Sequence, residues 1–186
     1  MQRGVFSSIA MNVGGDTLDL CCGDGFNAYY FYSIKSKKVI GIDFASEAIR
    51  WARRNFRTQN LEFIVGDIRN DIPVGLFDNI VWDAAIEHFT ETEISDLMGR
   101  IKSSLKPTGT LSGYTIVEKE HGKINHLHQH EYEFQNKEDL ARFLTPHFKN
   151  VQVFTTNSPE RVNLYFYASD GLLPFDKDWN LQIRQL

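Results

Sequence analysis

Short apolar runs alternate with helix-length segments along this chain, and this alternation limits the possible folds more than any other pattern in it. Four runs, at 17–21, 39–43, 61–65 and 77–82, are near-continuously apolar, as is typical of strands buried on both faces. Helical patterns follow the first, second and fourth runs, at 26–34, 46–57 (with Ser46 as the expected N-cap) and 91–105. This order predicts βαβ units and a parallel sheet, an α/β fold.

The last third of the chain changes character. The stretch "LKPTGT" at 105–110 is expected to end the third helix and turn into a strand at 110–117. Asn136 is the expected N-cap of a helix that reaches Phe148. Strands at 150–154 and 162–168 follow, and the link between them is too short for a parallel crossover. We therefore expect the parallel sheet to finish in an antiparallel hairpin.

Length and composition indicate one ordinary globular domain. The 186 residues, 42% hydrophobic and 24% charged, predict a single domain over 1–186, with a short N-terminal segment at 1–16 and a C-terminal tail at 170–186 that could form a homodimer contact. The net charge of −4 argues against a nucleic-acid partner. No apolar run is long enough for a membrane span, and no signal peptide is apparent. The only cysteines, Cys21 and Cys22, are adjacent, which favours a cytoplasmic location over a disulfide-bonded one.

A glycine loop lies where the first strand gives way to the first helix, in "TLDLCCGDGFNAYY". Gly23 and Gly25 lack Cβ atoms, so the loop can turn tightly and its backbone can approach a ligand. Asp19, Asp43 and Asp67 lie near the ends of the first three strands. The carboxyl ends of parallel strands line one crevice, where an acid such as Asp43 can accept hydrogen bonds from both hydroxyls of a ribose.

The loop by itself is compatible with two kinds of cofactor. The pattern Gly23-x-Gly25-x-x-Ala28, followed by Asp43, also satisfies the dinucleotide fingerprint of an NAD-type oxidoreductase. However, the negative charge of Asp19 would repel a pyrophosphate and suits a cationic ligand. The chain also has no Tyr-x-x-x-Lys pair, and an antiparallel ending is unusual for dinucleotide folds. These features favour a cationic nucleoside.

Five segments carry a family resemblance. "LDLCCGDGF", "VIGIDFASEAI", "LEFIVGDI", "FDNIVWDAAIEHF" and "LKPTGTL" occur in this order, and together they resemble the class I S-adenosylmethionine-dependent methyltransferases over about 17–168. The resemblance implies a Rossmann-like three-layer sandwich whose seven-stranded, mostly parallel sheet has the order 3-2-1-4-5-7-6, with strand 7 antiparallel. It also implies S-adenosylmethionine as the cofactor.

Position by position, the resemblance assigns the loop to the methionine part of that cofactor. Asp19, Cys21, Gly23 and Gly25 occupy the acid-x-Gly-x-Gly-x-Gly pattern of the family. Cys21 stands where the first glycine is usual, so the approach of the backbone to the ligand at that position is left open.

The same resemblance assigns the adenosine part to later strands. Asp43 would bind the ribose hydroxyls and Phe44 would cover one face of the adenine, while Asp67 and Ile68 would hold its edge. Asp83 falls in the fourth-strand motif, which lines the methyl-transfer region in the family.

Histidines supply the candidates for a general base. His88 follows the fourth strand, beside Glu87, and the segment "EHGKINHLHQHEYEF" at 120–134 adds His126, His128 and His130. These three share one face of the segment if it is extended. A substrate-binding wall, an ordinary loop and a metal site are the alternatives for this segment, and because it lacks a zinc motif we predict no metal ligand.

The absence of certain motifs narrows the class of methyl acceptor that we expect. The chain lacks the Asn/Asp-Pro-Pro-aromatic motif of enzymes that methylate exocyclic amines of bases or protein glutamine, and it lacks a Pro-Cys nucleophile. We therefore expect methyl transfer to an O, N or C nucleophile of a small molecule. A non-catalytic module that binds S-adenosylmethionine is one alternative, and an NAD-type oxidoreductase is the other.

Overall fold

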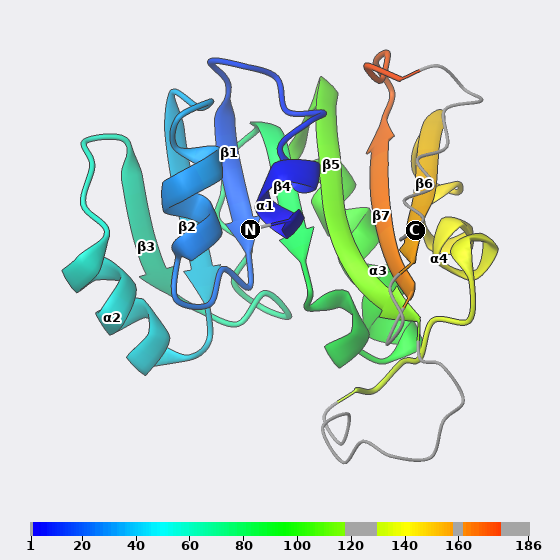
Figure 1. Ribbon diagram of the computed structural model, residues 1–186, viewed down its shortest axis with the longest axis horizontal. Coiled ribbons are helices and arrows are strands. Elements are labelled where there is room, and N and C mark those ends of the chain that lie inside the picture. The colour runs from blue at the N-terminus through cyan, green and yellow to red at the C-terminus, as the bar shows by residue number, and fades with distance from the viewer. Residues whose placement is uncertain (1, 118–129, 158–161, 176–186) are drawn as a thin grey trace.

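A computed structural model describes residues 2–117, 130–157 and 162–175. Their centre is one seven-stranded sheet with the order β3-β2-β1-β4-β5-β7-β6, which confirms the predicted architecture (Figure 1). The strands are β1 (Asp16–Leu20), β2 (Lys38–Asp43), β3 (Leu61–Val65), β4 (Phe77–Asp83), β5 (Leu105–Val117), β6 (Asn150–Asn157) and β7 (Val162–Ser169).

Strand direction follows the prediction. The five neighbouring strands β3, β2, β1, β4 and β5 pair in parallel, whereas β7 is antiparallel to both β5 and β6. The carboxyl ends of β1, β2 and β4 therefore lie side by side, because β1 pairs with β2 on one edge and with β4 on the other. This arrangement brings Asp19, Asp43 and Asp83 to one rim of the sheet.

Helices cover both faces of the sheet. They are α1 (Gln2–Ser7), α2 (Ser46–Asn55), α3 (Glu91–Ser103) and α4 (Lys137–Leu144), with a π-helical segment at Ala28–Tyr32 and a single helical turn at Ile86–His88. In Figure 1, α1 lies in front of the sheet and α3 lies behind it. None of the helices in the described parts of the chain is both long and apolar enough to cross a membrane.

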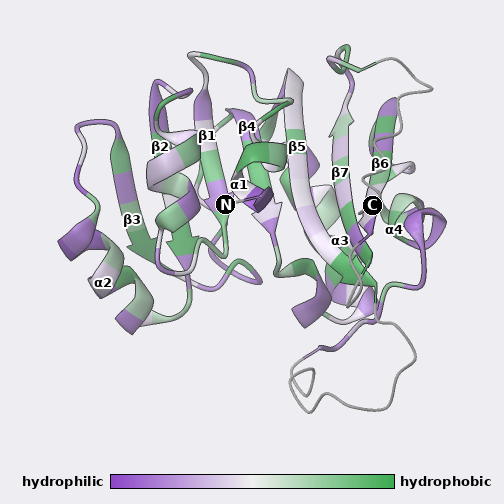
Figure 2. Cartoon of the chain, viewed as in Figure 1, coloured by the Kyte–Doolittle hydropathy of each residue, from purple (hydrophilic) through white to green (hydrophobic). Residues whose placement is uncertain are grey.

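Alternation along the central strands separates the two faces. Leu18 and Leu20 of β1 and Trp82 of β4 pack with the buried residues of α3 and α4. The opposite face holds a second cluster, in which Tyr32 packs with Val81 and with residues of α2. Because successive strand residues point to opposite sides, Asp19 and Asp83 belong to the face that carries α1 and Tyr32. Bands of opposite hydropathy along α2 in Figure 2 fit a helix that packs one side on the sheet.

Several predicted boundaries were wrong. The predicted N-cap Ser46 is the first residue of α2; Ala45 is the N-cap, and its amide donates to the carboxylate of Asp43. The helix predicted at 26–34 is π-helical over Ala28–Tyr32, where the amide of Ser33 donates to the carbonyl of Ala28. A π-turn of this kind leaves no signal in the spacing of apolar residues.

The region around β5 also differs from the prediction. The third helix ends at Ser103, and β5 begins at Leu105 instead of at 110, so "LKPTGT" continues the strand rather than forming a turn. The pairing of β4 with β5 is irregular between Phe77 and Asn79, which accommodates this stretch. Helix α4 begins after Asn136, whose side chain accepts from the amide of Asp139 as predicted, but it ends at Leu144. Helix α1 was not predicted.

Candidate functional site

Two adjoining cavities open at the carboxyl ends of β1, β2 and β4, each of about 380 Å³. Cys21 and Ala84 line both cavities and form the boundary between them. The acidic cavity is lined by Arg3, Asp19, Cys21, Cys22, Gly23, Asp24, Phe26, Asn27, Asp83 and Ala84. The apolar cavity is lined by Cys21, Asp43, Phe44, Gly66, Asp67, Ile68, Arg69, Ala84, Ala85, His88 and Phe89.

Two carboxyl groups on neighbouring strands dominate the acidic cavity. Asp19 is 3% exposed, and burial raises its pKa well above the usual range, with further upward contributions from the charges of Asp83 and Asp43. Burial also raises the pKa of Asp83 to about 6, although hydrogen bonds from Ser7 and Tyr32 favour its ionised form. Gathering acids in this way is costly unless a cation balances them.

Helix α1 supplies a cationic group to the same cavity. Arg3 lines it, and the positive charge of this side chain lowers the pKa of Asp83. The helix is fixed in place by hydrogen bonds to the sheet: the hydroxyl of Ser112 donates to the carbonyl of Ser7, and the hydroxyl of Tyr167 donates to the carbonyl of Phe6. Sequence reasoning missed Arg3, since no motif connects residue 3 with the glycine loop.

The two glycines of the loop have different surroundings. Both have positive φ, 54° at Gly23 and 78° at Gly25. A Cβ added to Gly23 would meet nothing within 4 Å, because this residue faces the acidic cavity. A Cβ added to Gly25 would overlap the Phe63 ring and lie 3.1 Å from Cβ of Ala52. Gly25 therefore allows the loop to pack on α2 and β3, and it lines neither cavity.

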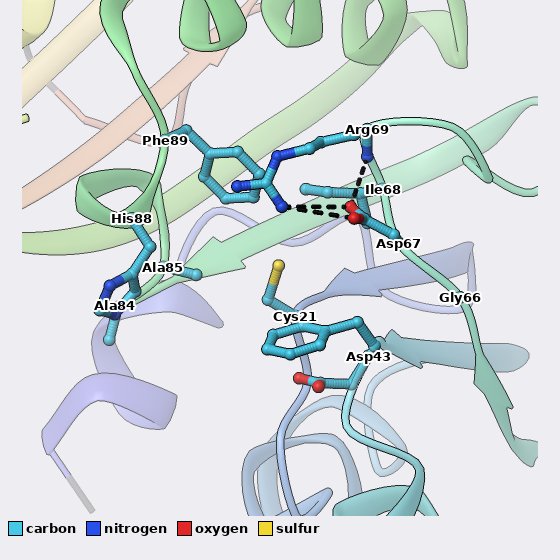
Figure 3. Close-up of a pocket in the computed structure, with 11 residues that line it drawn as sticks. Cys21, Asp43, Gly66, Asp67, Ile68, Arg69, Ala84, Ala85, His88 and Phe89 are labelled. Carbon is cyan, nitrogen blue, oxygen red and sulfur yellow. Dashed lines mark hydrogen bonds and ion pairs between the residues drawn. The ribbon is translucent and has the colours of Figure 1, made fainter. Parts of the chain in front are cut away.

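The cysteine at the first glycine position adopts the backbone geometry of a glycine. Cys21 has a φ of 55°, a left-handed conformation that costs a side-chain-bearing residue about 1–2 kcal/mol. Its sulfur points into the space between the cavity walls (Figure 3). Burial, together with the acids Asp43 and Asp19, raises the pKa of this thiol, so it stays protonated. Burial and the same two acids also raise the pKa of the Cys22 thiol.

Asp43 connects the glycine loop to the apolar cavity. One carboxylate oxygen accepts from the amide of Gly23 at 2.8 Å, and the other accepts from the amide of Ala45 at 2.8 Å. Each oxygen keeps a second lone pair for another donor. Next to it, Phe44 is 70% exposed at the edge of the cavity, while Ile68 is 2% exposed. Phe44 and Ile68 thus form an apolar slot beside the fixed carboxylate of Asp43.

Polar side chains also line the apolar cavity, on two sides. Figure 3 shows Asp67 and Arg69 on one side of the space and His88 on the other. Arg69 pairs with Asp67 at 3.3 Å and with Glu93 at 2.7 Å, and its guanidinium lies 4.6 Å from the centre of the Phe89 ring. Asp67 also accepts from the backbone amide of Arg69, at 2.9 Å. These contacts hold the Asp67 carboxylate at the cavity wall.

His88 belongs to a cluster that the sequence did not predict as a unit. One nitrogen or oxygen atom from each of Glu87, His88 and His130 lies within 4.8 Å of the others. Glu87 is 5% exposed and accepts from the hydroxyl of Thr115 at 3.0 Å. Burial raises the pKa of Glu87, whereas this hydrogen bond and the nearby histidines lower it.

The predicted site residues thus divide into three groups. Those lining the two cavities are Asp19, Cys21, Gly23, Asp43, Phe44, Asp67, Ile68, Asp83 and His88. Gly25 supports the loop from the core side, and His130 lies beside His88, with 5.1 Å between ring centres. His126 and His128 lie outside the described residues. Asp83, expected at the methyl-transfer region, lies in the acidic cavity with Asp19.

Comparison with known proteins identifies a family model and individual relatives. The model of a methyltransferase domain matches residues 17–109. The phosphoethanolamine N-methyltransferase of Plasmodium falciparum is 30% identical over 157 residues, which cover 80% of this chain and 59% of that protein. The ribosomal protein L11 methyltransferase of Hamiltonella defensa is 26% identical over 137 residues, which cover 72% of this chain and 44% of that protein. The chain therefore spans about half the length of these curated relatives.

The fold has close counterparts among solved structures. Human N-acetylserotonin methyltransferase in complex with SAM superposes with a TM-score of 0.69 and 20% sequence identity, over 91% of this chain and 52% of that one. At this level of identity, the similarity concerns the fold.

Proposed function

This chain belongs to the class I S-adenosylmethionine-dependent methyltransferase superfamily, and on that premise we propose that it transfers a methyl group from S-adenosylmethionine to an O, N or C atom of a small molecule. When bound, this cofactor supplies an activated methyl group on a positively charged sulfur. The residues of the two cavities then have to bind and orient it, align an acceptor and exclude water.

The acidic cavity suits the methionine part of the cofactor. That part carries an ammonium group, the sulfonium and a carboxylate. Asp19 and Asp83 offer negative charge to the cations, and Arg3 offers positive charge to the carboxylate. The open space above Gly23 allows a ligand to approach the loop backbone. Two acids close together would oppose a pyrophosphate, which argues against the oxidoreductase alternative.

The position of Asp43 is the single observation that carries the proposal. Its two amide donors, Gly23 and Ala45, fix the carboxylate at the end of β2, where the remaining lone pairs can accept from two ribose hydroxyls. Phe44 and Ile68 provide apolar surface beside it for an adenine ring, and Asp67 provides an acceptor for the exocyclic amine of the ring.

A small acceptor is supported by two observations. The relative from Plasmodium falciparum is named for phosphoethanolamine, a small amine. The net charge of −4 gives the chain no general attraction for nucleic acid. A protein acceptor, as the name of the relative from Hamiltonella defensa indicates for that protein, is the contrasting case for an experiment.

Titration calorimetry tests the cofactor assignment. S-adenosylhomocysteine is expected to bind the purified chain, and NADH is not. In Asp43→Asn, the affinity for S-adenosylhomocysteine should fall by about 10- to 100-fold, because a hydrogen bond to a charged group contributes about 1.5–3 kcal/mol. Tight binding of NADH, or an unchanged affinity in the variant, would contradict the assignment.

Catalysis is tested separately from binding. Radiolabelled methyl transfer to a panel of aminoalcohols, their phosphates, phenols and carboxylic acids, with a ribosomal protein as the macromolecular case, should show turnover with at least one small molecule. Binding of the cofactor without methyl transfer to any member would instead support the non-catalytic module.

A further inference from the structure

A compact cluster of nitrogen and oxygen ligands lies at the wall of the apolar cavity. Glu87 and His88 come from the turn after β4, and His130 comes from the segment that precedes α4. Their ligand atoms all lie within 4.8 Å of one another. Two imidazoles and one carboxylate are a common donor set for divalent transition metals.

The cluster is partly buried as well as compact. Glu87 is 5% exposed, and the side chain of His130 is 7% exposed. His88 is half-buried, and it also lines the apolar cavity. Placing a carboxylate and two imidazoles together away from water is unfavourable unless a positive charge compensates, and a metal ion supplies one.

Surrounding residues hold the ligands in a suitable state. Nδ1 of His130 lies 2.9 Å from a carboxylate oxygen of Glu133, and if Nδ1 donates its proton there, Nε2 is left with a lone pair for a metal. Carboxylate–histidine pairs of this kind orient metal ligands in many proteins. The hydroxyl of Thr115 donates to one oxygen of Glu87, so the other oxygen remains available for a metal.

The backbone connects the two halves of the cluster. The amides of Glu131 and Tyr132 both donate to the carbonyl of Glu87, at 2.9 and 3.2 Å. These bonds fix His130 beside the turn that carries His88. Zinc–nitrogen distances of about 2.1 Å place tetrahedral ligands about 3.4 Å apart, so each side chain would move inward by about 1 Å when an ion binds.

We propose that Glu87, His88 and His130 form a binding site for one divalent transition-metal ion of the zinc type. Since His88 lines the apolar cavity, a coordination position left open by the three protein ligands is accessible to a molecule in that cavity. The ligand that fits this position is an anionic or hydroxyl oxygen of the methyl acceptor, an extension that rests on the proposed function. Coordination would hold that oxygen next to the cofactor and lower its pKa.

With a hydroxyl acceptor, the hydroxyl releases its proton to solvent, and its oxygen forms a bond to the methyl carbon. The carbon–sulfur bond breaks, and its electron pair stays on sulfur, which becomes a neutral thioether. No oxidant or reductant is consumed.

Metal binding is measured without reference to activity. The protein is stripped with a chelator and dialysed, and then titrated with Co²⁺ by visible absorption and with Zn²⁺ by calorimetry. We expect one ion per chain at this cluster. Glu87→Gln, His88→Ala and His130→Ala should each weaken binding by more than the roughly 10- to 100-fold that outer partners contribute, and Glu133→Gln should weaken it within that range.

Matched controls separate this cluster from other histidines. His147→Ala removes a histidine outside the cluster, and the double variant His126→Ala/His128→Ala removes two more; both should keep the affinity of the wild type. Circular dichroism and thermal melting establish that each variant is folded, and Glu87→Gln retains a group that can accept from Thr115.

The outcomes distinguish the two proposals. Absence of Co²⁺ binding by the folded wild type, or binding that is lost in His126→Ala/His128→Ala but kept in His88→Ala and His130→Ala, overturns the metal site. Neither result bears on the binding of S-adenosylhomocysteine, which calorimetry reports separately. Metal binding with no affinity for S-adenosylhomocysteine would leave the site intact and reject the proposed function.

Discussion

The two cavities at the rim of the sheet have the same volume, share Cys21 and Ala84, and yet present opposite chemistry. The acidic cavity lies over the face that carries α1, where Asp19 and Asp83 have raised pKa values. The apolar cavity lies over the loops after β2, β3 and β4, where Phe44, Ile68 and Phe89 are its large apolar side chains.

This difference shows how one sheet edge can hold a molecule with a charged end and an apolar end. In the acidic cavity, we expect ligand recognition to depend on charge and therefore on pH. In the apolar cavity, we expect it to depend on surface contact, with Asp43 as the fixed polar point. Substitutions in the acidic cavity should therefore change the pH dependence of binding, whereas substitutions in the apolar cavity should reduce contact with the ligand.

The largest expected effect sharpens the contrast between the cavity side and the core side of the glycine loop. Gly25→Ala should lower the free energy of unfolding by about 3 kcal/mol, because the new Cβ would overlap Phe63 and Gly25 has positive φ. Gly23→Ala, which has open space, should lower it by about 1 kcal/mol, from backbone strain alone. Urea denaturation measures both values.

The same pair of variants reports on the ligand. Since only Gly23 lines the acidic cavity, Gly23→Ala should weaken the binding of S-adenosylhomocysteine while most of the protein remains folded. Equal losses of stability in the two variants would mean that Gly23 and Gly25 do not lie on different sides of the loop, one toward the cavity and one toward the core.

The next effect tests whether charge governs the acidic cavity. The folded-state pKa of Asp83 is about 6, above the ordinary value of 3.8, so its contribution to stability is complete below about pH 4 and is lost as pH rises through 6. The ligand-free protein should therefore lose about 1.4 kcal/mol of stability from this group between pH 5 and pH 8, since one pKa unit corresponds to about 1.4 kcal/mol. Thermal melting across this range checks the loss.

Binding should show the opposite trend. A cationic cofactor favours ionised Asp83, so affinity for S-adenosylmethionine should rise as pH increases through about 6. Asp83→Asn keeps a side chain that can bond to Ser7 and Tyr32 but removes the titration, and both trends should become weaker in it. A variant with the same pH dependence as the wild type would assign the titration to another group.

The smallest effect concerns the apolar cavity. Phe44→Ala should weaken the binding of S-adenosylhomocysteine by about 2- to 10-fold, since an aromatic contact contributes about 0.5–1.5 kcal/mol. Because Phe44 is 70% exposed, the free energy of unfolding should change by less than about 0.5 kcal/mol. Calorimetry and urea denaturation separate the two quantities, and a large loss of stability would contradict an open cavity edge.

The local pattern of apolar residues was sufficient to predict most of the strands and their order. Buried strands such as β2 and β4 are mostly apolar, and each ends in an acid. These acids could be assigned to one site from the sequence because parallel strands bring their carboxyl ends together. The same reasoning failed at two boundaries. At Ser46, the N-cap is instead Ala45, which has no side-chain cap. At Leu105, pairing with Phe77, a residue far away in the chain, begins β5 earlier than predicted.

Contacts between distant segments could not be read from the sequence. Arg3 reaches the acidic cavity only because α1 packs on β5 and β7 through Ser112 and Tyr167. Glu87 and His88 are adjacent in the chain, and nothing in the spacing of the sequence links them to His130. A single helical turn, Ile86–His88, and the approach of His130 bring their polar atoms together instead.

The carbonyl of Glu87 has a mechanical consequence. Two amides from one stretch, those of Glu131 and Tyr132, attach to this single oxygen, so the connection leading into α4 cannot be displaced from the end of β4 without both links breaking. Tyr132 is also tied to Asp139 within α4. A shift of the turn after β4 would therefore reach α4 through three hydrogen bonds, two at the carbonyl of Glu87 and one from Tyr132 to Asp139.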